Sequence, residues 1–285
     1  MKTFMIPTDF SANATHAAEY GYNLAKQIKA NIILCNAVIV PAELPQAGLV
    51  VWPSDEYDML MDESSSELRM LKSRLEANET SGVIKPAIAL ISKAGMVSDV
   101  VNGIAQTQQI DLKIIGPHTN NGLSGFVLGN HARKIIDNAL VPIMLVPKEA
   151  QLKPIKNIAF ATDFTNPAED LEYIYKLIEF ARPIGAEILL THVYNENTEN
   201  SDFLNRVNQL VLQLSNKANY PHVYYRLIKN KQTEKGLAWL CENGNIDILA
   251  MVHRKHNFLS FLVSGSHTHK MADNISIPLL VFPSK

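Results

Sequence analysis

Short apolar segments alternate along the chain with longer amphipathic segments. The apolar segments are nearly continuous, which is typical of strands that are covered on both faces. Strands are predicted at 2–7, 32–38, 86–91, 111–115 and 143–146, and then at 157–161, 187–193, 223–228, 246–252 and 278–283. Helices are predicted at 11–29, 54–78, 97–107 and 130–138, and then at 167–182, 202–217 and 234–242. Strands that alternate with helices over short connections predict doubly wound parallel sheets.

The chain contains two copies of one unit. The segment 114–147, in which a glycine-rich loop joins an apolar strand to a helix, returns 136 positions later. The repeated residues are Leu123, Ser124, Gly129, His131, Lys134, Asp137, Asn138, Pro142 and Pro147, which reappear as Leu259, Ser260, Gly265, His267, Lys270, Asp273, Asn274, Pro278 and Pro283. Identities at one offset and in one order indicate an internal duplication. We therefore predict two domains, at 1–150 and 151–285.

Composition and charge exclude several classes of protein. With 47% hydrophobic and 19% charged residues, the chain of 285 residues has the composition of an ordinary globular protein. Its formal net charge of −2 gives no reason to expect a nucleic-acid partner. No apolar run approaches the roughly 20 residues that a membrane-spanning helix needs, and no signal peptide is evident. We expect a cytoplasmic protein in which Cys35 and Cys241 are small, reduced core residues.

Several short motifs, repeated in order in both copies, resemble those of the universal stress protein family. In the first copy they are Pro7-Thr8-Asp9-Phe10-Ser11, Asn36-Ala37-Val38 and the block 111–147, and in the second copy 161–165, His192-Val193 and 247–283. The resemblance covers nearly the whole chain. It implies two tandem doubly wound sheets of five parallel strands in the order 3-2-1-4-5, a Rossmann-like fold of the adenine nucleotide alpha hydrolase type.

The resemblance also implies a nucleotide site. A doubly wound sheet binds ligands outside the carboxyl ends of the strands, where the strand order reverses, and here that point lies between the first and fourth strands. Family members that bind ATP carry G-x2-G-x9-G-(S/T), in which glycines let backbone amides approach phosphates. Their aspartate after the first strand is expected to accept a hydrogen bond from the adenine amino group, and the residue that ends the second strand to contact adenine or ribose.

The resemblance therefore gives two sets of candidate residues. In the first domain the expected nucleotide-binding residues are Pro7, Thr8, Asp9, Val38, Ile115, Gly116, Thr119, Gly129 and Asn130. In the second domain the weaker candidates are Thr162, Asp163, Val193, Lys255, Gly265 and Ser266.

Both copies depart from the ATP-binding pattern. In the first copy Thr119 replaces the second glycine, and Asn130, which can still cap a helix, stands where Ser or Thr is usual. In the second copy Val252 and Lys255 replace the first two glycines. Two interpretations remain open. The leading one is a regulatory stress-response protein that binds ATP or AMP, with Mg²⁺, in its first domain. The other is a nucleotide-free scaffold that acts through protein partners.

Two other kinds of site are less well supported. His253, His256, His267 and His269 could ligate zinc, but residues 267 and 269 would point to different faces of a helix, so we do not expect a metal site. The chain has no G-x-S-x-G, Walker A or H-E-x-x-H motif, and no residue stands out as a nucleophile. An enzyme is therefore not the leading interpretation, and at most slow ATP hydrolysis is expected.

The fifth strand of each copy would form an apolar edge of its sheet, at 142–147 and at 278–283. Exposed apolar edges pair readily with other strands, and members of the family dimerise through this strand. We predict that the two domains pair these edges within one chain as an intramolecular pseudo-dimer. Whether the protein also forms a homo-oligomer is left open.

Overall fold

A computed structural model of the chain describes residues 2–40, 54–77, 85–117, 135–162, 164, 167–194, 201–253 and 276–284. The strands are β1 (Thr3–Pro7), β2 (Asn31–Val38), β3 (Ile88–Ala94), β4 (Leu112–Ile115), β5 (Ile143–Leu145), β6 (Asn157–Ala161), β7 (Glu187–Tyr194), β8 (Val223–Lys229), β9 (Ile248–His253) and β10 (Leu279–Pro283). The helices are α1 (Ala12–Ile28), α2 (Ser54–Glu76), α3 (Val97–Thr107), α5 (Pro167–Ala181), α6 (Ser201–Ala218) and α7 (Thr233–Asn243), with a 3-10 turn, η1 (Arg182–Ile184).

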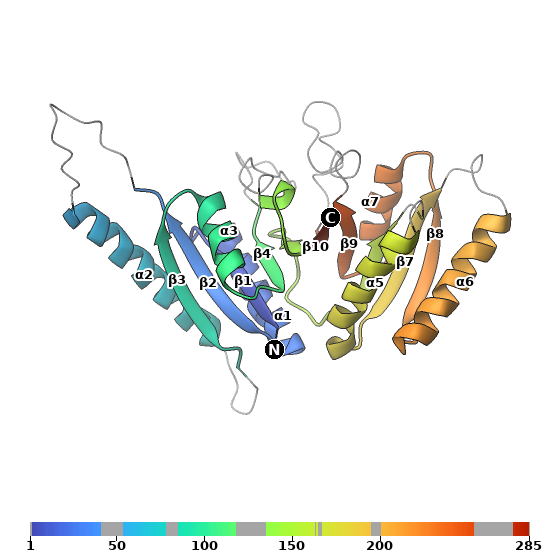
Figure 1. The fold of residues 1–285 in the computed structure, drawn as a ribbon, viewed down its shortest axis with the longest axis horizontal. Helices are drawn as coiled ribbons and strands as arrows, with labels where there is room; N and C mark the ends of the chain where they lie inside the picture. Colours follow the sequence, from blue (N-terminus) through green and yellow to red (C-terminus); the bar gives the residue numbers. More distant parts are fainter. Residues whose placement is uncertain are drawn as a thin grey trace.

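The strands form one continuous sheet in the order β3-β2-β1-β4-β5-β10-β9-β6-β7-β8. Each half has the predicted order 3-2-1-4-5, and within each half all neighbouring strands are parallel. The two halves meet where β5 pairs antiparallel with β10, and Leu280 lies opposite Met144 at the centre of this junction. The predicted pseudo-dimer is therefore confirmed, with the two sheets fused into one (Figure 1).

The described elements agree with the predicted ones to within two residues, except for the third strand. It was predicted at 86–91 but runs to Ala94, because Ser92, Lys93 and Ala94 continue to pair with the end of β2. β3 lies at the end of the sheet, where polar residues are tolerated on a strand and the apolar pattern ends before the pairing does. Of the helix predicted at 130–138, only the part after 134 falls within the described residues, and 135–137 are helical there.

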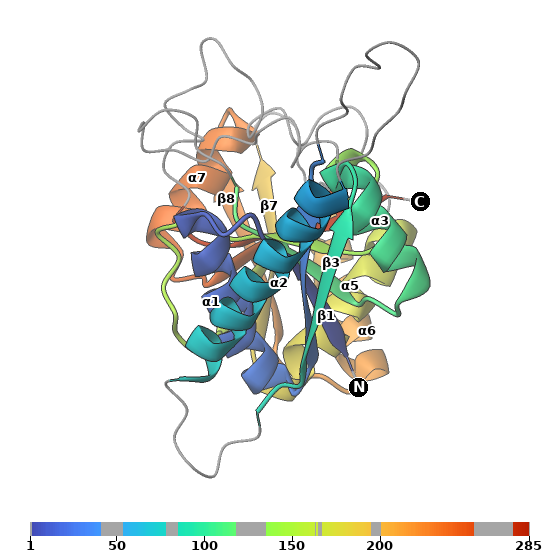
Figure 2. The same ribbon diagram turned by 90° about the vertical axis from the view of Figure 1, so that its left-hand side faces the viewer.

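Helices cover both faces of the sheet, and the one that matters most for the crevice is α1. It begins where expected, because the Ser11 hydroxyl accepts a hydrogen bond from the Ala14 backbone N–H at 3.3 Å. It packs closely on the sheet through Gly21, where an added Cβ would lie 2.7 Å from Cδ1 of Ile6 and 3.0 Å from Cδ1 of Ile114. Figure 2 shows α1 and α3 on opposite sides of this half of the sheet.

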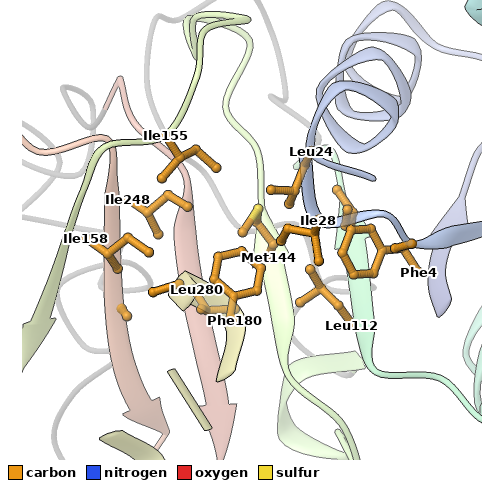
Figure 3. Packing of buried hydrophobic residues seen from close by; sticks show 14 of the residues in the cluster. Phe4, Leu24, Ile28, Leu112, Met144, Ile155, Ile158, Phe180, Ile248 and Leu280 are labelled. Atoms are coloured by element: carbon orange, nitrogen blue, oxygen red, sulfur yellow. The ribbon is translucent and has the colours of Figure 1, made fainter. Parts of the chain in front are cut away.

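The apolar core does not stop at the boundary between the domains. One cluster of buried side chains runs from the first domain into the second (Figure 3). It includes Phe4, Leu24, Ile28, Leu112 and Met144 from the first half, and Ile155, Ile158, Phe180, Ile248 and Leu280 from the second. The two halves thus share one hydrophobic core on this face, which is what an obligate interface requires.

Lys113 interrupts the core on the other face of the sheet. Its side chain is fully buried on β4, and its Nζ donates a hydrogen bond to Oδ1 of Asn102 on α3 at 3.1 Å. Burial lowers the pKa of Lys113, while the neighbouring Cys35 acts in the opposite direction. The equivalent positions of the second domain carry Leu249 and Ala238, so the fold requires neither polar residue.

We expect Lys113→Met to raise the free energy of unfolding at pH 7 by about 1–4 kcal/mol, the range found when apolar side chains replace buried charged groups. The sign of the pH dependence follows from the lowered pKa. Lys113 binds its proton more tightly in the unfolded chain than in the folded protein. The free energy of unfolding of the wild type therefore rises as the pH increases towards about 10.4, the pKa of a lysine in an unfolded chain. The variant has no lysine at this position and lacks this rise. Urea denaturation at pH 7 and pH 9.5 measures both effects.

The matched control is Lys93→Met, which removes the same charge from an exposed position on β3. This control should change the free energy of unfolding by less than about 0.5 kcal/mol. A Lys113→Met variant that is no more stable than the wild type at pH 7 would show that Lys113 is well accommodated in the core.

Candidate functional site

A cavity of about 130 Å³ lies at the carboxyl ends of β1 and β4, where the strand order reverses. We call it the first-domain crevice. Of the candidate residues predicted from the sequence, Pro7, Thr8, Asp9, Ile115 and Gly116 line it. The remaining wall is largely apolar and comes from β2 and α3, mainly from Cys35, Ala37, Val97, Val100 and Val101. Burial raises the pKa of the Cys35 thiol to about 12, so this residue behaves as an apolar wall and not as a thiolate.

The loop after β1 places an acidic side chain at the crevice. Thr8 is buried and its hydroxyl accepts a hydrogen bond from the Phe10 N–H at 3.0 Å, while Oδ1 of the exposed Asp9 accepts from the Ser11 N–H at 3.1 Å. Phe10 has a φ of 62°, a left-handed conformation that is rare for a bulky side chain. Such a strained backbone, held by specific hydrogen bonds, is common at ligand sites.

Asn36 fixes this loop against the rest of the sheet. Its Nδ2 donates to the Thr8 carbonyl at 2.7 Å, and its Oδ1 accepts from the Ser64 hydroxyl of α2 at 2.8 Å. The Ser64 hydroxyl in turn lies 2.6 Å from that of Ser92 on β3. Polar side chains from β2, α2 and β3 therefore support the loop that carries Asp9. The sequence motif contained Asn36, but its role as an anchor was not predicted.

The residue at the end of β2 that lines the crevice is Ala37, and Val38 is not among the lining residues. Successive side chains of a strand point to opposite faces of the sheet, and Ala37 shares the α3 face with Cys35. Val38 is buried, and its position in the alternation places it on the other face with Asn36. The contact between Val38 and a ligand therefore stays a prediction, and Ala37 is the neighbouring residue that lines the crevice.

Gly116 is explained by packing before any ligand is considered. A Cβ at this position would collide with the backbone carbonyl of Asn13 in the first turn of α1. The Asn13 side chain also donates to the Pro117 carbonyl at 3.0 Å, which holds the end of β4 against α1. Because the two backbones touch here, only glycine lets α1 begin this close to the crevice.

The second domain repeats the loop after its first strand. The buried Thr162 accepts a hydrogen bond from the Phe164 N–H at 2.9 Å, and Phe164 has a φ of 54°. The Thr162 hydroxyl also donates to the buried carboxylate of Asp170 on α5. His192, at the position of Asn36, contacts the Thr162 carbonyl through Nδ1 at 2.9 Å. The duplication has therefore preserved the loop geometry, with different side chains as anchors.

The side chains beside this loop differ in the second domain. Val193 stands at the position of Ala37, and Gly236 of α7 stands at the position of Val100. A Cβ at Gly236 would lie 2.5 Å from Cγ1 of Val193, so the valine side chain occupies the space that a side chain on the helix would need. The buried Val252 replaces Gly116. The second domain thus carries valine at the positions of Ala37 and Gly116, and glycine at the position of Val100.

The other predicted site residues lie outside the described residues. They are Thr119, Gly129, Asn130, Asp163, Lys255, Gly265 and Ser266 of the nucleotide set, and His256, His267 and His269 of the metal set. His253, at the end of β9, is described, and its Nε2 lies 3.2 Å from Oδ1 of Asp137 in the first domain. Within the described part of the chain, no group of three His, Cys, Asp or Glu residues is placed to hold a metal ion.

Comparisons with known proteins agree with this architecture. The model of the Universal stress protein family matches residues 1–147 and again residues 154–283. A universal stress protein of Methanocaldococcus jannaschii is 28% identical over 149 residues, which is 52% of this chain and 82% of that protein. None of the helices in the described part of the chain is both long and apolar enough to cross a membrane.

Solved structures show the same fold over the whole chain. A universal stress protein of Archaeoglobus fulgidus superposes with a TM-score of 0.70 at 17% identity, covering 99% of this chain and 98% of that one. A putative universal stress protein of Pseudomonas aeruginosa gives a TM-score of 0.56 at 12% identity, covering 99% and 93%. With both halves matched by the family model and both halves built on its fold, the chain belongs to the universal stress protein family, of which it is a tandem member.

Proposed function

We propose that the first domain binds an adenine nucleotide, ATP or AMP, and that the protein acts in a stress response in a regulatory and not a catalytic role. The observation that carries this proposal is the first-domain crevice, an apolar cavity at the switch point of a doubly wound sheet with a carboxylate beside it. Mostly apolar pockets with a few placed polar groups are typical of cofactor sites.

The lining suits a flat heteroaromatic base. Ala37 and the valines of α3 offer an apolar wall, and the small Ala37 side chain leaves room beside it. In this proposal the Asp9 carboxylate accepts a hydrogen bond from the 6-amino group of adenine, a position at which guanine and hypoxanthine carry a carbonyl oxygen. The proposed base site therefore consists of Thr8, Asp9, Ala37, Ile115 and the wall of α3.

The residues proposed to bind the phosphates are assigned from the sequence alone. In this proposal the helix that follows the glycine-rich loop directs its amino terminus at them, with Gly129 allowing close approach and Asn130 donating from its amide. When bound, Mg²⁺ would neutralise phosphate charge. The second domain is proposed to bind no nucleotide, because the larger Val193 and Val252 stand at the positions of Ala37 and Gly116.

Nucleotide content and thermal stability test the proposal together. Protein purified without added nucleotide is denatured, and the supernatant is analysed for ATP and AMP by chromatography and mass spectrometry. Stripped protein is then titrated with ATP, AMP and GTP while its melting temperature is followed. We expect ATP or AMP to bind with one site per chain and to stabilise the protein by about 2.7 kcal/mol at a hundred times its Kd. GTP should have much less effect.

Two other outcomes contradict the proposal in different ways. If no nucleotide co-purifies and none raises the melting temperature, the alternative of a nucleotide-free scaffold is favoured. If two nucleotides bind per chain, the second domain is not closed by its valines.

A further inference from the structure

The hydrogen bonds that connect the loop after β1 to α2 and β3 all run in one direction. Ser64 has a single hydroxyl hydrogen, which it donates to Oδ1 of Asn36 at 2.8 Å. In the 2.6 Å contact between the Ser64 and Ser92 hydroxyls, Ser92 is therefore the donor. The amide of Asn36 completes the series by donating to the Thr8 carbonyl at 2.7 Å. We call Asn36, Ser64 and Ser92 the anchoring network, in which each hydrogen bond polarises and strengthens the next.

Ser64 determines which end of the Asn36 side chain faces the loop. Its hydroxyl holds the amide oxygen on the side of α2, so the amide nitrogen points at the Thr8 carbonyl. If the amide were turned around, two oxygens that can only accept would face each other at Thr8. Replacing Ser64 by Ala removes the donor that sets this orientation, although the residue itself does not line the first-domain crevice.

The backbone that this network holds is the one that carries Asp9. The Thr8 N–H donates to the Cys35 carbonyl at 2.8 Å, and the Thr8 carbonyl accepts from Asn36, so both polar groups of the Thr8 backbone are held by β2. The Asp9 carboxylate then accepts from the Ser11 N–H. Because the Asp9 side chain is exposed, its direction depends on these hydrogen bonds and not on close packing. Functional side chains need such support to stay within about 0.5 Å of their working position.

Ser64 is an unusual residue for its place on α2. It is only 5% exposed, and the residues that follow it on the same face at helical spacing are Leu68, Leu71 and Leu75, which are buried in the core. An apolar residue would fill this place without a buried hydroxyl, which costs stability unless it is hydrogen-bonded. Packing of the helix on the sheet therefore does not explain the serine, whereas its hydrogen bond to Asn36 does.

The second domain keeps the anchor of the loop but cannot extend it in the same way. His192 stands at the position of Asn36 and contacts the Thr162 carbonyl directly. Leu227 is paired with His192 as Ser92 is paired with Asn36. A leucine side chain forms no hydrogen bond, so the third strand of this domain has no donor at the position of Ser92. The fold thus requires a contact to the carbonyl, and the extension through the two serines is particular to the domain with the crevice.

We propose that Ser64 and Asn36 are positioning residues for base selection, which hold the Asp9 carboxylate where it accepts a hydrogen bond from the 6-amino group of adenine. This inference rests on the proposed function. Ser64 acts through Asn36 and the backbone of Thr8, so its loss leaves the apolar wall of the crevice in place. What is lost is the contribution of Asp9 to the choice between bases.

The anchoring is tested first in the protein without nucleotide. Nuclear magnetic resonance measures how fast the amide protons of Phe10 and Ser11, which are hydrogen-bonded within the loop, exchange with water. Ser64→Ala should raise both exchange rates several-fold, because the loop is released from α2. Ser66→Ala, the same substitution at an exposed position of α2, should leave them unchanged.

Base selection is then measured by titrating nucleotide-stripped protein with ATP and with ITP, which carries a carbonyl oxygen at position 6. The wild type should prefer ATP, and Ser64→Ala should lower the ratio of the two affinities about fivefold, the effect of one hydrogen bond. Asp9→Ala should lower the ratio as well, and adding Ser64→Ala to it should have no further effect on the ratio. A general loosening of the domain would weaken both nucleotides alike.

The proposal is wrong if Ser64→Ala leaves the exchange rates of the loop unchanged, whichever nucleotides bind. It is also wrong if Ser64→Ala and Ser66→Ala change the ATP-to-ITP ratio equally, or if Ser64→Ala still lowers this ratio when residue 9 is alanine. A wild type that binds neither nucleotide, although Ser64→Ala speeds the exchange, contradicts the proposed function instead. Ser64 would then anchor the loop without any part in base selection.

Discussion

Replacing Ala37 by Val should abolish binding of ATP and AMP by the first domain. The change puts into the crevice the side chain that the second domain carries as Val193, and it fills the space proposed for the base. Overpacking costs about 1–3 kcal/mol, and the upper end of this range corresponds to a loss of affinity of more than a hundredfold. Calorimetric titration of nucleotide-stripped protein measures the change.

Two companion variants separate loss of the site from loss of the fold. The double change Ala37→Val and Val100→Gly copies the pair Val193 and Gly236, so it should keep the melting temperature near that of the wild type and still bind no nucleotide. Val38→Ala, on the other face of β2, should bind nucleotide with unchanged affinity. Normal ATP affinity in the Ala37→Val variant would show that the base lies elsewhere.

Replacing Met144 by Lys should lower the free energy of unfolding by more than about 4 kcal/mol, because it places an unpaired charge in the shared core. Met144 has no exposed surface and lies opposite Leu280, at the centre of the antiparallel junction of β5 and β10. Urea denaturation followed by circular dichroism measures the loss. Size-exclusion chromatography at low urea concentration then reveals whether the halves have separated.

Leu140→Lys is the control for Met144→Lys. Leu140 lies shortly before β5, but its side chain is 66% exposed, so the same substitution should change stability by less than about 0.5 kcal/mol. Similar urea midpoints for the two variants would mean that the junction tolerates charge and that the two halves do not share a core.

The sequence predicted most of the fold because strands, helices and the repeat each left a periodic signal. Apolar runs marked every strand, and the polar end of β3 was missed because pairing at an edge does not require apolar side chains. The repeat also contained a signal that was overlooked. Pairing β2 with β7 along their lengths matches Ala37 with Val193, so the two crevices differ in the size of this side chain.

Other features could not be predicted because they depend on contacts between distant segments. The collision that makes Gly116 necessary comes from Asn13, more than a hundred residues earlier, and no local pattern reports it. A cavity at the junction of the two domains is lined by Tyr20, by the linker and by the end of α7, which are far apart in the sequence. The burial of Tyr20 beside residues of the second domain does not follow from its position on a predicted helix.

The antiparallel pairing of β5 with β10 also changes how this assembly responds to dilution. Two separate chains joined through these strands would come apart at low concentration, whereas a covalent tether holds the partners at a high effective concentration regardless of expression level. The two halves can also differ in sequence, because a mutation in one half does not appear in the other, as it would in a dimer of identical chains. One half is therefore free to change the residues around its crevice while its partner keeps them, as at Val193 and Ala37.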